Sequence, residues 1–539
     1  MIYLLDYGAG NVRSVRNAVR ALGFEVRDVA DPADIGRAER LIFPGVGSFG
    51  SAMARLHELG FLEPLREYLL AGRPYLGICL GLQTLFEGSE ESPGVAGLGL
   101  IKGRIERFRL PSLAVPQIGW NGIAIRQPSA LFNDYQGEKL YFVHSFRAAA
   151  TPENRDWVLS ETTYGHDFVS AVQKGQVAAC QFHPEKSGAA GLAILRNFLT
   201  AERLDQARPG SAAVPSVGPA ETKLARRIIA CLDVRSNDQG DLVVTKGDQY
   251  DVREAGDERQ VRNLGKPVEL ARRYFEEGAD EITFLNITGF RDFPLEDQPM
   301  LEVLERTSEQ VFVPLTIGGG IREFTDAEGR FYSALDVAAR YFRAGADKIS
   351  IGSEAVAAVE EYLKNGSRKS GRSLIEQIAY VYGAQAVVIS IDPRRVYVRS
   401  PEDTPHPLIR TAFPGPDGEE YCWYQCTIKG GREGRDLDAA TLAKVCEELG
   451  AGEILLNCID KDGTNSGFDL ELINLVRQAV TIPVIASSGA GCPEHFSEVF
   501  ERTGAEAALA AGIFHRREVG IGEVKSHLAA QGIEVRKTT

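Results

Sequence analysis

The chain has 539 residues, of which 44% are hydrophobic and 25% charged, as is ordinary for a globular protein with sizeable cores. Its length predicts about three or four domains at ~150 residues each. The net charge of −14 argues against a protein that binds nucleic acid or lies on a membrane surface. It does not argue against binding small anionic metabolites through backbone groups. No apolar run approaches the roughly 20 residues needed to span a membrane.

The eight cysteines are scattered without the spacing of metal ligands. Cys422 and Cys426 are four residues apart in a run rich in Tyr and Trp, which favours hairpin packing over a zinc site. The chain opens directly on a strand-like run, Met-Ile-Tyr-Leu-Leu-Asp, which leaves no room for a transit peptide. We therefore expect reduced thiols and a cytoplasmic location, with no metal and no cofactor.

The first 200 residues alternate short β-rich runs with helical patterns. This alternation predicts an α/β domain with a mostly parallel sheet and flanking helices. The expected strands are 2–6, 40–43, 74–78, 140–143 and 177–182, and the expected helices are 11–22, 49–71, 80–88 and 188–200. The last of these helices is expected to close the domain.

Three residues in this domain predict nucleophilic catalysis. Cys79 lies in a Gly-x-Cys-x-Gly turn, where the glycines permit a sharp strand-to-helix turn and the helix dipole favours thiolate. One such motif is weak, because a buried core cysteine has the same pattern. His183 and Glu185, however, follow a predicted strand and supply a base and a carboxylate on one face of an extended segment. Together the three predict a nucleophile, a general base and the group that orients the base.

A further glycine-rich turn at 43–50 has backbone N–H groups that we expect to face an oxyanion. With this turn, the cysteine motif and the His-Pro-Glu motif, residues 1–200 resemble the class I (triad-type) glutamine amidotransferases. Runs 6–11 and 116–121 are similar to the subfamily that serves histidine biosynthesis. The resemblance implies that Cys79 attacks the glutamine side-chain amide, that ammonia leaves, and that water clears the glutamyl thioester. The expected oxyanion and glutamine contacts are Gly45, Val46, Gly47, Leu80, Gln83, His144, Ser145 and Phe146. For His144, a structural hydrogen bond is an equally good interpretation.

Residues 201–222 are rich in Pro and Gly without an apolar period, which predicts a linker to a second domain at 223–539. In that domain eight predicted strands alternate with helical patterns, which favours a (β/α)8 barrel. The expected strands are 227–233, 281–287, 312–317, 348–352, 386–392, 453–459, 483–487 and 507–511. Insertions are expected near 235–244, 323–334 and 400–432.

The second domain repeats itself. Run 313–320 is echoed by 482–489, and run 345–352 by 504–512. The same number of residues separates Asp233 from Asp392 as separates Gly345 from Gly504. Two half-barrels joined by duplication account for this pattern.

Asp233 and Asp392 end the first and fifth predicted strands, so in a barrel they face each other across the catalytic mouth. A carboxylate at the end of a buried strand is costly unless it is used, which predicts a paired acid and base. Glycine turns after the strands let backbone N–H groups approach phosphate, and the repeat places two such cradles on opposite sides. A ligand with a phosphate at each end fits this arrangement. The expected contacts are Lys246, Gly318, Gly319, Gly320, Ser350, Ser353, Ser487, Ser488, Gly489, Ala511 and Gly512.

Residues 224–537 resemble the cyclase of the imidazole glycerol phosphate synthase family, through runs 231–234, 390–392, 459–464 and 510–515. The resemblance implies further substrate contacts at Asp462, Gly463 and Thr464. With the amidotransferase in front, the chain is similar to the fused, eukaryotic-type form. The implied substrates are glutamine and a bisphosphate, phosphoribulosyl-formimino aminoimidazole carboxamide ribonucleotide. The implied products are imidazole glycerol phosphate and aminoimidazole carboxamide ribonucleotide. The chain departs from bacterial relatives at Asn286, at 351–354 and in the Ser-Ser-Gly of the second cradle.

Four charged residues stand at the starts of predicted strands: Arg227, Glu281, Lys348 and Glu453. Strand starts belong to the face of the barrel opposite the active site. The resemblance implies that the amidotransferase docks on this face and that ammonia enters through a ring of these charges. A stabilising salt-bridge network is the alternative, and the two roles are compatible. We expect a monomer with an internal domain interface, and no nucleic-acid or membrane partner.

Two rival functions fit parts of the chain. A sister phosphosugar isomerase on the same duplicated barrel also binds a bisphosphate through two aspartates, but it needs no ammonia. The other rival is a silent metabolite-binding scaffold, against which the intact triad and aspartate pair argue. Product analysis with glutamine and the ribulosyl bisphosphate separates all three.

Overall fold

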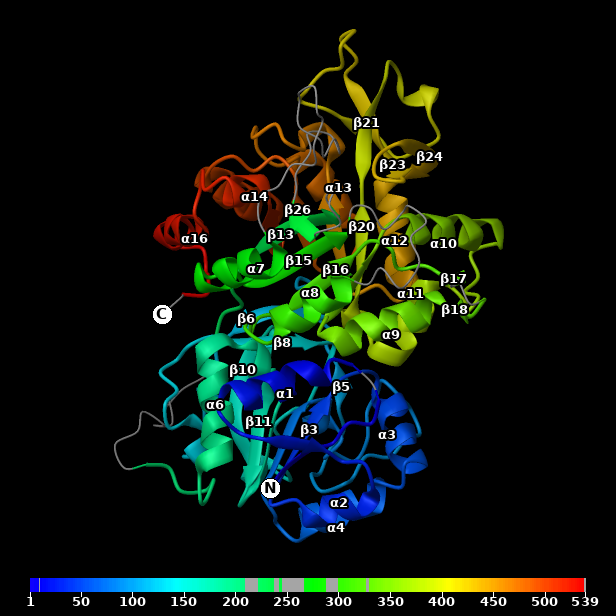
Figure 1. The fold of residues 1–539 in the computed structure, drawn as a ribbon. Helices are drawn as coiled ribbons and strands as arrows, with labels where there is room; N and C mark the ends of the chain where they lie inside the picture. The colour runs from blue at the N-terminus through cyan, green and yellow to red at the C-terminus, as the bar shows by residue number, and fades with distance from the viewer. Residues whose placement is uncertain are drawn as a thin grey trace.

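The computed structural model describes residues 1–8, 10–208, 222–236, 242–244, 266–286, 299–325 and 329–537. These residues form two α/β units, one above the other in Figure 1. The expected contact Lys246 lies outside the described residues, as do most of the predicted linker 201–222 and parts of the predicted insertions 235–244 and 323–334.

An eight-stranded sheet forms the centre of the N-terminal unit, in the order β2-β1-β3-β4-β12-β11-β10-β7. The run from β2 to β12 is parallel and the remaining pairings are antiparallel. The strands are β1 Ile2–Leu4, β2 Val26–Asp28, β3 Arg40–Gly45, β4 Tyr75–Cys79, β7 Ala124–Ile125, β10 Val158–Tyr164, β11 His166–Lys174 and β12 Val177–Cys180. Alternate side chains of this sheet enter different cores, because successive residues of a strand point to opposite faces. Leu4 and Ile42 pack in one core, and Tyr3 and Leu41 pack in the other.

The helices of this unit are α1 Val12–Ala21, α2 Pro32–Arg37, α3 Phe49–Glu58, α4 Leu62–Leu70, α5 Leu80–Gln83 and α6 Gly188–Thr200. Helix α6 has the predicted bounds. The predicted helix 49–71 is wrong in its middle, where the chain turns at Gly60 with a φ of 71° and starts a second helix. The predicted helix 80–88 is a single turn. The chain beyond it forms isolated β-bridges, among them one between Phe86 and Ile101.

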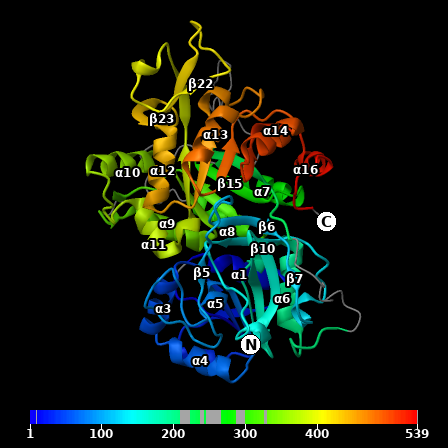
Figure 2. The same cartoon turned by 180° about the vertical axis from the view of Figure 1, so that it is seen from behind.

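The predicted strand 140–143 exists as β8, Leu140–His144, but not in the main sheet. It pairs antiparallel with β6, Gln117–Asn121, in a separate hairpin. A second small pair joins β5, Glu106–Arg107, to β9, Phe146–Arg147. Seen from behind, β6 lies directly beneath the upper unit (Figure 2).

Eight parallel strands close into a barrel in the C-terminal unit, where the last strand, β27, pairs with the first, β13. In order, they are β13 Arg227–Ser236, β15 Glu281–Asn286, β16 Leu315–Gly318, β19 Lys348–Ile351, β20 Val387–Ile391, β25 Glu453–Asn457, β26 Val484–Ser487 and β27 Ala507–Ala510. Each overlaps one predicted strand, so the predicted (β/α)8 barrel is confirmed. Mostly aliphatic side chains fill its interior, among them Ile229, Val388 and Ile485.

The helices of the barrel unit are α7 Pro267–Glu276, α8 Pro299–Ser308, α9 Ala334–Ala344, α10 Ser353–Lys364, α11 Leu374–Tyr382, α12 Ala439–Leu449, α13 Leu470–Ala479, α14 Pro493–Thr503, α15 Gly512–His515 and α16 Ile521–Ala530. The short strand β14, Leu242–Val244, pairs antiparallel with the end of β13. Another short strand, β17, Phe324–Thr325, pairs antiparallel with β18, Phe331–Tyr332. No helix in the described part of the chain is long and apolar enough to cross a membrane.

The predicted insertion near 400–432 belongs to a small antiparallel sheet that rises above the barrel in Figure 1. Its strands are β21 Pro393–Val398, β22 Ile409–Arg410, β23 Tyr421–Ile428 and β24 Glu433–Asp438. Strand β21 begins directly after Asp392. Cys422 and Cys426 are buried free thiols in β23, as hairpin packing predicts.

The starting ends of the barrel strands face the N-terminal unit, which is drawn below them in Figure 1. Asn17 Nδ2 of α1 donates to Ser308 Oγ of α8 at 2.9 Å. Lys186 Nζ pairs with Asp347 Oδ2 at 2.7 Å, and Trp120 Nε1 donates to the Asp280 carbonyl at 3.1 Å. These contacts fix hairpin β6–β8 and the segment after β12 against the base of the barrel.

Candidate active sites

Cys79 ends β4 on a sharp turn. Its φ of 54° is positive, a conformation that a residue other than glycine adopts only when its surroundings hold it there. The glycines of the motif are required by close backbone approach: a Cβ on Gly77 would lie 2.6 Å from the Gly81 carbonyl oxygen, and a Cβ on Gly81 would lie 2.4 Å from the Phe43 carbonyl oxygen. The sequence therefore folds locally into a strained elbow that presents the thiol beyond the strand end.

His183 and Glu185 meet as the motif predicts, but not on an extended segment. His183 has extended backbone, and a 3-10 helix, Pro184–Lys186, follows it directly. The turn brings Glu185 Oε1 to 2.8 Å from His183 Nδ1. Gln181 Nε2 also donates to the Cys79 Sγ at 3.4 Å. All three predicted triad residues are buried together.

The two histidines of this site have opposite pKa shifts. Burial lowers the pKa of His183, but Glu185 and Cys79 oppose burial and raise that pKa well above its ordinary value. This favours the imidazolium form of His183 beside the Cys79 sulfur. Burial lowers the pKa of His144 to about 3, and its Nδ1 contacts the Phe146 carbonyl oxygen at 2.7 Å. His144 is therefore neutral, and its geometry favours the structural interpretation.

Of the remaining predicted glutamine contacts, Gly45 lies beside Cys79 in the sheet and Leu80 follows it in the chain. Gly45 is the register partner of Cys79 between β3 and β4, and Gln83 Nε2 donates to the Phe146 carbonyl at 3.1 Å. The N–H of Val46, expected to face an oxyanion, donates instead to the Tyr7 hydroxyl at 3.0 Å. The roles of Gly47, Leu80 and Ser145 in binding glutamine stay predictions. Sequence reasoning missed Tyr7 and Gln181, although Gln181 precedes the His-Pro-Glu motif by two residues.

The charge of Glu185 gives a direct test of this triad. In Glu185→Gln the pKa of His183 is expected to fall, because the amide keeps the shape of the carboxylate but not its charge. Glutamine hydrolysis should fall by between about 10²- and 10⁴-fold, the range for losing a proton-transfer group or its orienter. The measurement is the imidazole NMR titration of His183 together with the glutaminase rate. Glu161→Gln, at an ion pair with Arg126 elsewhere in the domain, is the control. An unchanged titration of His183 would contradict this electrostatic assignment.

A cavity of about 430 Å³ opens at the carboxyl ends of the barrel strands. The predicted residues that line it are Asp233, Gly318, Gly319, Gly320, Ser350, Ser353, Asp392, Asp462, Gly463, Ser487, Ser488, Gly489, Ala511 and Gly512. Thr464 is not among the lining residues, and its hydroxyl donates to the Lys461 carbonyl at 2.9 Å. Lining residues that sequence reasoning did not select include Arg322, Lys429 and Asn457. Asn457 ends β25 as Asp392 follows β20, so its strand-end position was an available signal.

The carboxylate of Asp392 is held by its neighbours in this cavity. Asn457 Nδ2 donates to Asp392 Oδ1 at 2.8 Å and to Ser390 Oγ at 3.0 Å. Burial raises the pKa of Asp392 and the charge of Asp462 adds to this, while the hydrogen bonds from Asn457 and Ser390 oppose it. A raised pKa keeps a carboxyl protonated to higher pH than an ordinary aspartate, which suits it to donate a proton. Asp233, on β13 at the opposite side of the barrel from β20, has the Cys231 thiol 4.0 Å from its Oδ1.

Backbone approaches closely in both predicted cradles. A Cβ on Gly319 would lie 2.2 Å from the Asn286 carbonyl oxygen, and one on Gly489 would lie 2.2 Å from the Gly467 carbonyl oxygen. At the first cradle Ser350 Oγ is buried without a hydrogen-bond partner among the described residues, at the start of the turn that leads into α10. An unpartnered hydroxyl beside a helix start fits a phosphate oxygen.

The four charged residues at the strand starts form a closed ring. Arg227 pairs with Glu281 at 2.9 Å and with Glu453, and Lys348 pairs with the same two carboxylates at 2.6 and 2.7 Å. Each side chain is at most 1% exposed. Tyr141 of β8 lies between the charge ring and the triad. Its aromatic ring is 6.5 Å from the His183 imidazole, and it is close enough to Glu281 and Arg227 for their charges to act on it. Burial and the charge of Glu281 raise the pKa of Tyr141 well above its ordinary value, so this phenol stays neutral between the triad and the ring.

Among the described residues, no cluster of His, Cys, Asp or Glu is placed to hold a metal ion.

Comparison with known families gives two matches. Residues 3–201 match the family "Glutamine amidotransferase class-I", and residues 227–520 match "Histidine biosynthesis protein".

Three relatives illustrate the similarity of the whole chain. It is 60% identical over 537 residues to the chloroplastic imidazole glycerol phosphate synthase hisHF of Arabidopsis thaliana, which covers 99% of this chain and 89% of that one. It is 54% identical over 544 residues to the hisHF enzyme of Schizosaccharomyces pombe, covering 99% and 100%. The barrel unit alone is 44% identical over 314 residues to the imidazole glycerol phosphate synthase subunit HisF of Methanopyrus kandleri, covering 58% of this chain and 99% of that one. With an amidotransferase and a barrel fused in one chain, this protein belongs to the imidazole glycerol phosphate synthase family.

Proposed function

We propose that the chain hydrolyses glutamine in its N-terminal domain, 1–200, and uses the ammonia in its barrel domain, 223–539, to form an imidazole ring. The observation that carries this proposal is the alignment of the two sites. The buried charge ring at the base of the barrel has Tyr141 and His183 on one side and the barrel interior on the other. A family rival without ammonia chemistry has no use for this arrangement.

The triad accounts for the first half of the reaction. The Cys79 thiolate attacks the side-chain amide carbon of glutamine, and the His183 imidazolium protonates the nitrogen that leaves as ammonia. Glu185 keeps the imidazole oriented throughout. His183 then takes a proton from water, which hydrolyses the thioester to glutamate. The Val46 N–H can serve the oxyanion only after its hydrogen bond to Tyr7 breaks.

The barrel cavity accounts for the second half. The substrate is a ribonucleotide bisphosphate, phosphoribulosyl-formimino aminoimidazole carboxamide ribonucleotide, and its phosphates occupy the Gly319 and Gly489 cradles. Ammonia condenses with the ribulosyl carbonyl, and the carbonyl oxygen leaves as water. The imidazole ring then closes as the substrate is cleaved into imidazole glycerol phosphate and aminoimidazole carboxamide ribonucleotide. These steps need one proton donor and one acceptor. The raised pKa of Asp392 favours it as the donor, with Asp233 as the acceptor.

Product analysis tests this function. The wild-type chain, given glutamine and the bisphosphate, is expected to release both barrel products and glutamate. Isomerised bisphosphate without ammonia incorporation would support the isomerase rival instead, and binding without turnover would support the scaffold. We also propose that the chain acts as a monomer, since both sites are built from a single chain, and that it is cytoplasmic, although the plant relative is named as chloroplastic.

The ring gives a prediction about ammonia passage. In Lys348→Ala, more glutamine should be consumed per imidazole product, while synthesis from ammonium salts stays nearly unchanged, because ammonia is small and neutral and the cavity is untouched. Losing one partner of a buried ion pair costs about 3–5 kcal/mol, so the melting temperature should fall as well. The measurement is the ratio of glutamate to imidazole product. Lys102→Ala, at an exposed pair with Glu87, is the control. An unchanged ratio in folded Lys348→Ala would return the ring to a purely structural role.

A further inference from the structure

We propose that Arg395 is a positioning residue of the barrel site, which holds the loop 458–469 that contributes Asp462 and Gly463 to the cavity. The inference rests on the proposed barrel reaction only for its kinetic readout. Arg395 lies on β21, three residues after Asp392, and its side chain is only 5% exposed. Arg395 therefore joins β21, which follows the cavity residue Asp392, to the loop that carries the cavity residue Asp462.

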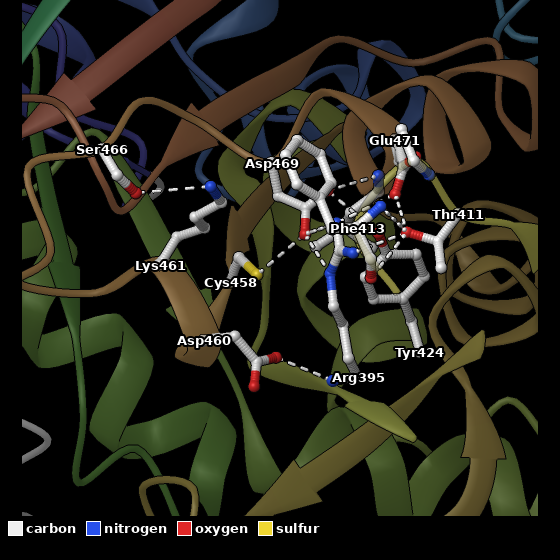
Figure 3. A network of polar contacts seen from close by, with 12 residues as sticks. Arg395, Thr411, Phe413, Tyr424, Cys458, Asp460, Lys461, Ser466, Asp469 and Glu471 are labelled. Atoms are coloured by element: carbon white, nitrogen blue, oxygen red, sulfur yellow. Dashed lines mark hydrogen bonds and ion pairs between the residues drawn. The ribbon is translucent and has the colours of Figure 1, made fainter. Parts of the chain in front are cut away.

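The guanidinium of Arg395 contacts both carboxylates at the start of α13. Its Nε and Nη2 donate to Asp469 Oδ2 at 2.9 and 2.7 Å, and its Nη2 donates to Glu471 Oε2 at 3.0 Å. The backbone N–H of Arg395 also donates to Asp460 Oδ2 at 2.7 Å, near the other end of the loop. Figure 3 shows these groups converging from the small sheet and the barrel loop.

Asp469 is the point at which the loop is closed. Its carboxylate caps α13 by accepting from Leu472 N at 3.1 Å, and it also accepts from the Cys458 thiol at 3.4 Å. Cys458 directly follows β25, so one carboxylate binds both ends of the loop. The Tyr424 hydroxyl of β23 donates to the same carboxylate at 2.9 Å. Asp469 is 2% exposed, and a buried charge of this kind needs its cation.

The insertion near 400–432 supplies the outer wall of this cluster. Thr411 Oγ1 accepts from Arg395 Nη1 at 2.9 Å and donates to Glu471 Oε2 at 2.8 Å. The half-exposed ring of Phe413 lies 5.3 Å from the Arg395 guanidinium and 5.2 Å from Lys461 Nζ. The insertion thus keeps the guanidinium in one orientation. Its role in the barrel is to buttress the loop from outside the cavity.

Arg395 has no place in the cavity wall itself, so its effect on chemistry must pass through the loop. Two consequences follow if the loop loosens. Substrate loses contacts at Asp462 and Gly463, and the charge of Asp462 moves away from Asp392, whose pKa it helps to raise.

The test uses the full chain with ammonium salts, which isolates the barrel. In Arg395→Met, kcat/KM for the bisphosphate should fall by about 10- to 100-fold, since a misplacement of ~1 Å costs this much. KM should rise, and the upper limb of the pH profile should move to lower pH. Amide hydrogen exchange within 459–466 should become faster. Glutamine hydrolysis measured without the bisphosphate should be unchanged.

Matched variants separate positioning from general damage. Arg410→Met removes an arginine of the same small sheet that is 71% exposed and paired with Glu420, and it should leave both readouts at wild-type values. Arg395→Lys keeps the charge without the fork and should lie between wild type and Arg395→Met. Tyr424→Phe removes one hydrogen bond to Asp469 and no charge, so it should shift exchange and KM in the same direction by less.

If Arg395→Met does not fold, Arg395→Lys and Tyr424→Phe decide. Folded variants with wild-type kcat/KM and wild-type exchange in the loop would overturn the proposal. Loss of kcat/KM with unchanged loop exchange and unchanged pH profile would also overturn it. A wild-type chain that forms no imidazole product would refute the proposed function, whereas hydrogen exchange would still test the role of Arg395.

Discussion

Cys79→Ala is expected to lose glutamine-dependent synthesis by about four or more orders of magnitude, the cost of removing a catalytic nucleophile. Synthesis from ammonium salts at high pH should persist, because the barrel cavity lies beyond the charge ring and shares no residue with the triad. The fold should tolerate the change, since alanine removes one sulfur atom and the elbow is held by Gly77, Gly81 and the strands beside it. The measurement is imidazole product formed with each nitrogen source.

The other thiols supply the control. Cys492 occupies the N-cap position of α14, is partly exposed and is not among the residues that line the barrel cavity, so Cys492→Ala should keep both activities. Alkylating reagents should likewise spare the buried thiols other than Cys79, such as Cys180 and Cys446, because burial raises their pKa. Glutamine use that survives in Cys79→Ala would remove the amidotransferase assignment of this residue.

Asp392→Asn is expected to lower turnover by about 10²- to 10⁴-fold with glutamine and with ammonium salts alike, the usual contribution of a general acid or base. Substrate binding should be retained, because the amide keeps the hydrogen bond with Asn457 and the two phosphate cradles are untouched. Asp233→Asn should behave in the same way. The measurement is turnover with both nitrogen sources, beside the dissociation constant of the bisphosphate from calorimetry.

Stability gives a control with a defined sign. The folded pKa of Asp392 is raised, so its stabilising contribution is present below the pKa of an unfolded aspartate and is lost as the pH rises through the folded pKa. Asparagine carries no such loss. Asp392→Asn should therefore be at least as stable as wild type at neutral pH, with the advantage disappearing in acid. Normal turnover from ammonium salts in a folded Asp392→Asn protein would end the assignment of this carboxyl to proton transfer.

The features that could be predicted are those fixed by residues near each other in the sequence. The eight barrel strands were found because each is a short apolar run bounded by turn residues, and because the duplication shows the same run twice. The motif around Cys79 could be predicted because its turn is local. Its positions require glycine, since backbone atoms a few residues away or on the neighbouring strand leave no room for a Cβ. His183 and Glu185 are two residues apart, so their contact is local even though a 3-10 turn, rather than an extended segment, makes it.

The predictions that were wrong concern features that depend on residues distant in the sequence. The run 140–143 was correctly predicted as a strand but wrongly placed, because strand pairing depends on partners distant in sequence, and β8 pairs with β6 beneath the barrel. The direction of the Val46 N–H could not be read from its glycine-rich turn, since it depends on the hydroxyl of Tyr7. Helix 80–88 stops after one turn where the following chain makes bridges with residues near 101 and 105.

The sequence by itself determined the two fold classes, the order of the domains, and the residue types at the nucleophile and at the ends of the barrel strands. These depend on periodicity and on local backbone geometry. The sequence also predicted the members of the charge ring, but the tertiary structure alone decided that each of its cations pairs with both glutamates and that Arg395 pairs with Asp469 and Glu471. A buried charge is stable only beside a partner a few ångströms away, and that distance is fixed by barrel closure and by the packing of the small sheet, not by spacing along the chain.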